Sequence, residues 1–307
     1  MSGPMDIRAQ VVRSHRHYHA DGNLVVRCEN VLYRIWLGLF QMQSAVWNRI
    51  FSIPRHPDSL EGTTDNCPFV IPGTVTVKEL DSLLDMMVGA GAELGDMEDE
   101  YTLPRYDIED LIRVLKITTE WEMWHLRAIA ITSIDSLPYH QGRAWDAFRK
   151  LACGVEYRVQ DWIQVTFRMV ASLPMDMWQG AHFRFLSNAL MYKIACTKFE
   201  IDRHRKELAS TAPPFVASVA CDHELTDRER CKTAWEMSFF DVFARLLVHP
   251  DNRYNDLEVL DAMREYPSSD WGGLCEYCHS ISVDNIADKG WFNKEGQIMD
   301  SAVATLL

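Results

Sequence analysis

The sequence predicts an α+β fold that is mainly helical, with short strands near its start followed by an all-α region. Apolar and polar residues alternate over 24–28 and again over 31–35, the period of two half-buried strands joined by a tight turn. From 145 to 208 the apolar residues instead recur at helical spacing, punctuated by Gly154 and by a Leu-Pro pair. The length of 307 residues suits two domains.

Helices are predicted after the hairpin because the apolar spacing changes from two residues to three and four. Ser44 interrupts this stretch and can cap a second helix. Thr76 and Glu79 have the spacing of a capping box ahead of an apolar stripe over 80–88, and Asp107 can cap a further helix. A Leu-Pro pair then ends the helical pattern, so we expect the first domain to span residues 20–135.

The chain outside that domain is divided by its composition. Residues 1–19 are polar and are expected to form a flexible arm, and residues 136–307 to form a helical C-terminal domain. Within the C-terminal domain, a linker of small residues precedes a helix that ends before His249 and Pro250. Another helix is expected to open at Asn255, with Leu257 among the residues on its inner face.

Charge and hydropathy exclude several classes of function. The formal charge is −13, so the chain as a whole repels phosphate backbones and nucleic acid is not expected as a partner. No apolar run reaches the length of about 18 residues that a membrane span requires. The N-terminal residues lack the apolar core of a secretory signal, which predicts an intracellular protein, cytoplasmic or nuclear. Eight cysteines are then better explained as thiols or metal ligands than as disulfides.

Three stretches of the first half resemble a BTB/POZ domain, and more closely the fungal proteins in which such a domain precedes a long helical region. A strand follows an Asp-Gly turn in DGNLVVR, a second strand runs into a helix in VLYRIWLGLF, and a Ser opens a second helix in SAVWNRIF. A later stretch resembles the helix pair that closes the fungal unit: DLIRVLKITTEWEMWHLRAIAITSID. The resemblance implies a BTB/POZ-like domain over 20–135.

The resemblance also implies a mode of association. Members of this family dimerise through the first helix; some bridge substrates to cullin-type ubiquitin ligases and others recruit corepressors. The family commonly begins that helix with a His and a basic residue, near an acidic residue that matches Asp21. Trp36 and Leu37 stand there instead, so Asp21 lacks its usual cationic neighbour, and burying it unpaired would be costly. The charged corepressor pocket is therefore expected to be absent.

The start of this helix offers an apolar surface in place of the charged pocket. Such a patch favours association by apolar burial, so we expect a homodimer. The predicted interface consists of four side chains: Trp36, Leu37, Leu39 and Phe40.

The sharpest local motif is the C-x-x-C-H at 275–279. Alone it is typical of covalent haem attachment, and C-x-x-C also of redox pairs, but no signal segment and no βαβ pattern accompany it. Zinc fits better, because two cysteines three apart can reach one ion from a turn. Cys221, Cys231 and His223 could complete a shell with Cys275 and Cys278. The alternative is that these cysteines are merely small buried residues.

The sequence therefore favours a non-enzymatic protein–protein interaction scaffold, which self-associates through its first domain and presents a helical partner-binding region. One alternative is a substrate adaptor of a cullin-type ubiquitin ligase. The other is a metal-dependent enzyme built on the C-terminal cysteines and histidines, which would require an open coordination position and a nearby base. No cofactor is certain from sequence, and a structural zinc is the one that the cysteines suggest.

Overall fold

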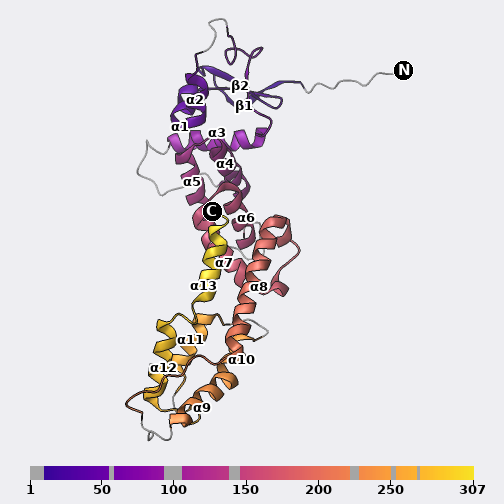
Figure 1. Ribbon diagram of the computed structural model, residues 1–307. Coiled ribbons are helices and arrows are strands. Elements are labelled where there is room, and N and C mark those ends of the chain that lie inside the picture. Colours follow the sequence, from indigo (N-terminus) through magenta and orange to yellow (C-terminus); the bar gives the residue numbers. More distant parts are fainter. Residues whose placement is uncertain are drawn as a thin grey trace, which may run out of the picture. The chain divides into compact units, whose positions relative to one another are not determined.

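The computed structural model of the protein describes residues 10–54, 59–92, 106–137, 146–221, 228–249, 254–267 and 270–307 (Figure 1). The fold is mainly helical with one small sheet, as the sequence predicts. The chain divides into two compact units, Met1–Trp145 and Asp146–Leu307, here called unit 1 and unit 2. Residues 138–145, just beyond the predicted boundary at 135, lie outside the described residues.

Unit 1 contains a four-stranded sheet of order β1-β3-β2-β4. The predicted hairpin is confirmed, because β2 and β3 are antiparallel with Val26 opposite Tyr33. Glu29 makes its turn with a positive φ of 51°. Strands β1 and β4 pair in parallel with β3 and β2 on the two sides of the hairpin. The strands are β1 (Val12–Tyr18), β2 (Leu24–Cys28), β3 (Val31–Ile35) and β4 (Phe69–Val70).

Strand β1 corrects the prediction of a flexible arm over 1–19, of which residues 1–9 lie outside the described residues. Its polar side chains have partners far along the chain. The buried His17 ring lies 2.9 Å from the Asp85 carboxylate, and Tyr18 donates a hydrogen bond to Asp65. Burial lowers the pKa of His17, against the raising effect of Asp85. Arg13 and Arg16 form ion pairs with the same two carboxylates, so this polar stretch is a strand fixed by hydrogen bonds and ion pairs.

Three of the helices described in unit 1 begin at the caps that the sequence predicts. The Ser44 hydroxyl accepts from the Trp47 amide, the Asp107 carboxylate accepts from the Asp110 amide, and Glu79 completes a capping box with Thr76. The helices are α1 (Leu37–Gln43), α2 (Ala45–Ser52), α3 (Val77–Ala92), α4 (Ile108–Glu120) and α5 (Trp124–Ser136).

The regular elements described in unit 2 are all helical, joined by turns and coil (Figure 1). Gly154 lies inside a helix rather than ending one. The next helix packs so closely there that a Cβ would sit only 3.2 Å from atoms of Trp162 and Ile163, which explains the glycine. The helices are α6 (Ala147–Tyr157), α7 (Gln160–Ser172), α8 (Asn188–Ser210), α9 (Arg228–Ser238), α10 (Ala244–Leu247), α11 (Asp256–Glu265), α12 (Glu276–Asp288) and α13 (Lys294–Ala304). Two 3-10 turns precede α8, and a π-helical turn at Phe239–Phe243 joins α9 to α10.

Two apolar cores build unit 2. The first joins α6 and α7 to the first part of α8 and to α13, with Phe148, Phe167 and Ile194 buried in it. The second joins α9, α10, α11 and α12 to the end of α8 and centres on Trp235 and Trp271, whose rings stack 4.9 Å apart. Helix α8 contributes to both. Among the described helices, none combines the length and apolarity that crossing a membrane requires.

Candidate metal centre

Four cysteines from three separate segments meet in the second core of unit 2. Their sulfur atoms all lie within 4.8 Å of one another. The Cys221 sulfur is 3.6 Å from that of Cys275 and 3.9 Å from that of Cys231. A zinc ion about 2.3 Å from four sulfurs in a tetrahedron would set neighbouring sulfurs about 3.8 Å apart. The four sequence-predicted ligands therefore come together at the spacing of a single metal ion.

The C-x-x-C pair lies at the N-terminus of α12. Cys275 is the N-cap residue, and its sulfur accepts a hydrogen bond from the Cys278 amide at 3.4 Å. Gly272 and Gly273 precede it with φ values of +64° and +108°, a left-handed turn that other residues adopt only with strain. The turn predicted before the pair thus aims both sulfurs at the same point from one helix end.

The other two sulfurs come from the coil after α8 and from α9. Cys231 lies in the first turn of α9 and is completely buried. Cys221 lies on this coil, which is fastened to α12 because the Ser282 hydroxyl bonds to both backbone groups of Val216. The Ser218 amide also donates to the Cys278 sulfur at 3.3 Å. The site therefore connects α9, α12 and the coil, which are distant in sequence.

Burial governs the charge of these thiols. Desolvation is the largest influence on two of them: it raises the pKa of Cys278 to about 12 and also raises the pKa of Cys231. The Ser218 amide and the N-terminus of α12 oppose this effect by favouring the thiolate. A divalent cation that binds these sulfurs would therefore displace their protons. The positive charge of the cation would then be neutralised by the buried thiolates.

The histidines considered with the cysteines do not join the described cluster. His279, the last residue of the C-x-x-C-H motif, places Nε2 at 2.9 Å from the Met263 carbonyl oxygen and packs its ring on Trp271. His223 lies outside the described residues. Among the residues that the structure describes, the cluster is thus a set of four sulfurs, three of them buried and Cys221 half-buried.

The predicted interface residues occupy different environments in unit 1. Phe40 is only 1% exposed and packs against Trp47 at a ring distance of 4.7 Å, so it belongs to the core rather than to a contact surface. Helix α1 is so short that the spacing of its apolar residues does not distinguish its inner face from its outer face. The sequence therefore predicts a surface position for Phe40 that the structure corrects. Trp36, Leu37 and Leu39 are half-buried.

Trp36 also corrects the expectation for Asp21. The indole Nε1 of Trp36 donates to the Asp21 carboxylate at 3.1 Å, while its ring stacks on His19 at 4.2 Å. Asp21 is exposed, so the predicted cost of burying an unpaired carboxylate does not arise. Trp36 therefore supplies the Asp21 carboxylate with a neutral donor.

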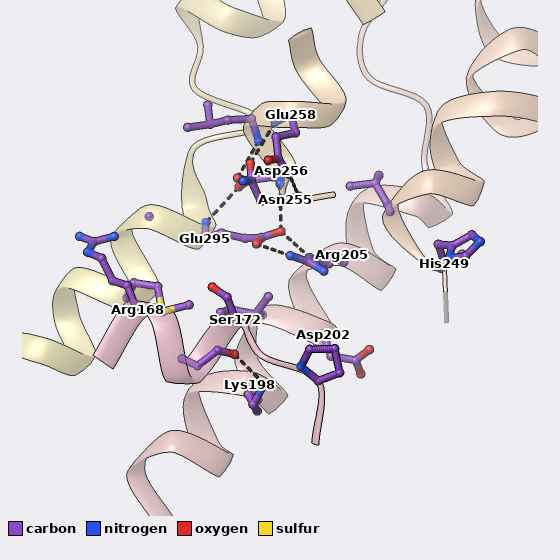
Figure 2. A pocket seen from close by; sticks show the side chains of 18 of the residues that line it. Arg168, Ser172, Lys198, Asp202, Arg205, His249, Asn255, Asp256, Glu258 and Glu295 are labelled. Carbon is purple, nitrogen blue, oxygen red and sulfur yellow. Dashed lines mark hydrogen bonds and ion pairs between the residues drawn. The ribbon is translucent and has the colours of Figure 1, made fainter. Parts of the chain in front are cut away.

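A groove of about 1310 Å³ in unit 2, which was not predicted from the sequence, is lined by residues of α7, α8, α11 and the N-terminus of α13 (Figure 2). At one side, two helix N-termini cap each other. Asp256 of α11 accepts from the Lys294 and Glu295 amides of α13 at 3.0 Å, and Glu295 accepts from the Asp256 amide at 3.1 Å. Arg205 of α8 binds Glu295 through two bonds of 2.6 Å.

These groups are almost completely buried; Arg205 pairs with Glu295, and the ring nitrogen Nε2 of His204 lies 3.5 Å from the Asp256 carboxylate. Burial raises the pKa of Glu295, against the lowering effect of Arg205. Close by in the groove, the ammonium of Lys198 donates to the carbonyl oxygens of Ala171 and Leu173 at the end of α7 (Figure 2), and burial lowers its pKa. These charged groups thus hydrogen-bond to backbone groups at the ends of helices, which is a structural role.

Comparison with protein-family models, with curated proteins and with solved structures found no match. The function of the chain is therefore argued from its own geometry.

Proposed function

We propose that the protein is a non-enzymatic interaction scaffold, in which a structural zinc ion holds unit 2 together and unit 1 mediates self-association. The observation that carries the proposal is the closed set of four sulfurs from three segments. Small regions that rely on a metal use it in place of extra apolar core, and four thiolates saturate the tetrahedral shell of zinc.

The donor set favours zinc and a structural role. Soft thiolate ligands at tetrahedral spacing suit zinc, whereas the oxygen ligands that calcium and magnesium prefer are not part of the cluster among the described residues. A catalytic zinc keeps one position for water and a base beside it. The one histidine next to the pair, His279, is turned to a backbone carbonyl. A zinc coordination shell that is filled by four sulfurs supports a structural site rather than a catalytic one.

The self-association proposal rests on unit 1. After β1, the order of its described elements supports a BTB/POZ-like domain: two strands, two short helices, a strand, a longer helix and a closing helix pair. We propose that this unit is BTB/POZ-like and forms a homodimer through α1. Leu37 and Leu39 are half-buried there and Met42 is 84% exposed, so apolar atoms remain available on this helix. A role as a cullin adaptor stays a prediction.

Metal analysis of the purified full chain tests the zinc. We expect one zinc per chain, and close to none in Cys278→Ser, because three remaining sulfurs leave the site open. Cys67→Ser removes a half-buried thiol of unit 1 and should keep the zinc. A substoichiometric zinc content that does not rise after growth in zinc would overturn this part of the proposal.

Light scattering at micromolar concentration tests the self-association. We expect a dimer for the natural chain and a monomer for Leu37→Arg, since a cation in an apolar contact must be desolvated without a partner. Leu60→Arg changes a leucine that is 63% exposed on a loop and should leave the dimer intact. A natural chain that is strictly monomeric would refute the proposed interface.

A further inference from the structure

One of the four clustered cysteines differs from the other three. Cys231, Cys275 and Cys278 are at most 8% exposed and lie on helices or at a helix end, whereas Cys221 is half-buried and lies on coil. An oxidant in solution therefore meets Cys221 first. Its sulfur lies 3.6 Å from that of Cys275, closer than the 3.9 Å that separates it from the sulfur of Cys231.

The distance between these two sulfurs suits a disulfide after a small shift. A disulfide bond is about 2.05 Å long, so the two atoms must approach by about 1.5 Å. Cys221 lies on coil rather than on a helix, whereas Cys275 is held as the N-cap of α12, so we expect Cys221 to make the approach. The pair joins an accessible thiol to a fixed one, the usual arrangement of a redox-active pair.

We propose that Cys221 and Cys275 form a redox modification site at which hydrogen peroxide converts the metal clip into a disulfide and releases the ion. This inference rests on the structural zinc proposed above. The Cys221 thiolate attacks one peroxide oxygen and becomes a sulfenic acid, and the departing oxygen leaves as water after taking up a proton. The Cys275 thiolate then attacks the sulfenic sulfur, and the second oxygen leaves as water with another proton.

The two sulfurs thus lose two electrons in total, and the peroxide O–O bond gains them. Two of the four ligands are consumed, which leaves Cys231 and Cys278 too few to hold zinc tightly. The new disulfide still ties the coil to α12, but the connection to α9 through Cys231 is lost. Oxidation should therefore loosen α9 more than α12.

The test uses the full zinc-loaded chain treated with hydrogen peroxide. Zinc release is followed with a chromogenic chelator, and the disulfide is located by peptide mapping without reduction. We expect one zinc released per Cys221–Cys275 disulfide, with recovery after dithiothreitol and zinc. Hydrogen exchange should rise in α9 (Arg228–Ser238) with a smaller change in α12 (Glu276–Asp288).

A matched pair of variants separates this chemistry from general damage. Cys221→His keeps a zinc ligand but offers no sulfur, so release should be slowed by about tenfold or more. Cys196→Ser removes a half-buried thiol of α8 outside the cluster and should behave like the natural chain. Zinc that stays bound, release with a different disulfide, or unchanged release from Cys221→His would each overturn the proposal. An untreated chain without zinc would instead overturn the structural zinc itself.

Discussion

Two regions of unit 2 solve the same problem by different means. The cysteine cluster connects α9, α12 and the coil after α8, and the Arg205–Glu295–Asp256 network connects α8, α11 and α13. Both join segments that are far apart in sequence, and both are deeply buried. The network holds its own opposite charges, whereas the cluster gathers four acidic groups of one kind. The network pairs its charges within the protein itself, whereas the cluster is proposed to connect its segments through a bound cation.

Removal of the metal should have the largest effect on the stability of unit 2, and it tests the difference between the two regions most directly. Structural zinc contributes about 10 kcal/mol or more to the folding of small zinc-dependent peptides, and part of that is expected in unit 2. After chelation we expect hydrogen exchange to rise throughout α9 and α12, and the fluorescence of the stacked Trp235 and Trp271 to change. The sheet of unit 1 serves as the internal control. Unchanged protection of α9 and α12 would contradict a metal-dependent core.

Breaking the ionic network should have the next largest effect. Arg205→Met leaves the Glu295 carboxylate buried without its cation, which we expect to cost about 3–5 kcal/mol in urea unfolding. The loss should be similar with and without zinc if the two regions act independently. Lys206→Met, next along α8, removes only a surface pair with Asp202 and should change stability by less than about 1 kcal/mol. Equal effects of the two variants would refute the structural role of Arg205.

The smallest effect on stability is expected for a change at Asn255, at the edge of the Arg205–Glu295–Asp256 network. Asn255 caps α11 from an exposed position, where its side chain accepts from the Glu258 amide at 2.9 Å. Asn255→Ala should cost about 1 kcal/mol, since a lost cap leaves one amide to water rather than buried. Asn255→Asp should retain the cap and so most of the stability. A loss for Asn255→Ala as large as that for Arg205→Met would mean that the cap also fixes the buried carboxylates.

The same contrast explains what could be predicted from sequence. Spacing rules located the hairpin, the caps at Ser44 and Asp107, and the four cysteines, because each signal depends on residue type at short range or on a rare residue. The Arg205 network has no such signal: common charged residues 39 and 90 positions apart are brought together only by tertiary packing. Helices α12 and α13 were not predicted for the related reason that polar residues such as His279, Ser282 and Glu295 occupy part of their buried faces, so helical spacing is present without a clear apolar signal.

Several errors share a second cause, which is that composition is a poor guide to burial in short elements. The polar residues before 19 include a strand held by ion pairs, and Phe40 lies in the core although its neighbours on α1 are only half-buried. Leu257 was expected to face inward, yet it is 47% exposed, because the inner side of α11 begins with the buried Asp256. The charged Asp256 therefore occupies the inward position that the spacing of apolar residues predicted for Leu257.

X-ray absorption spectroscopy at the zinc edge tests the central claim most directly, since it counts the ligand atoms around the metal in the intact chain. The account predicts a single shell of four sulfurs at about 2.3 Å, reduced to three sulfurs with one lighter neighbour in Cys221→His. A shell in the natural chain that contains oxygen or nitrogen beside three sulfurs would contradict a closed structural clip and favour a catalytic metal.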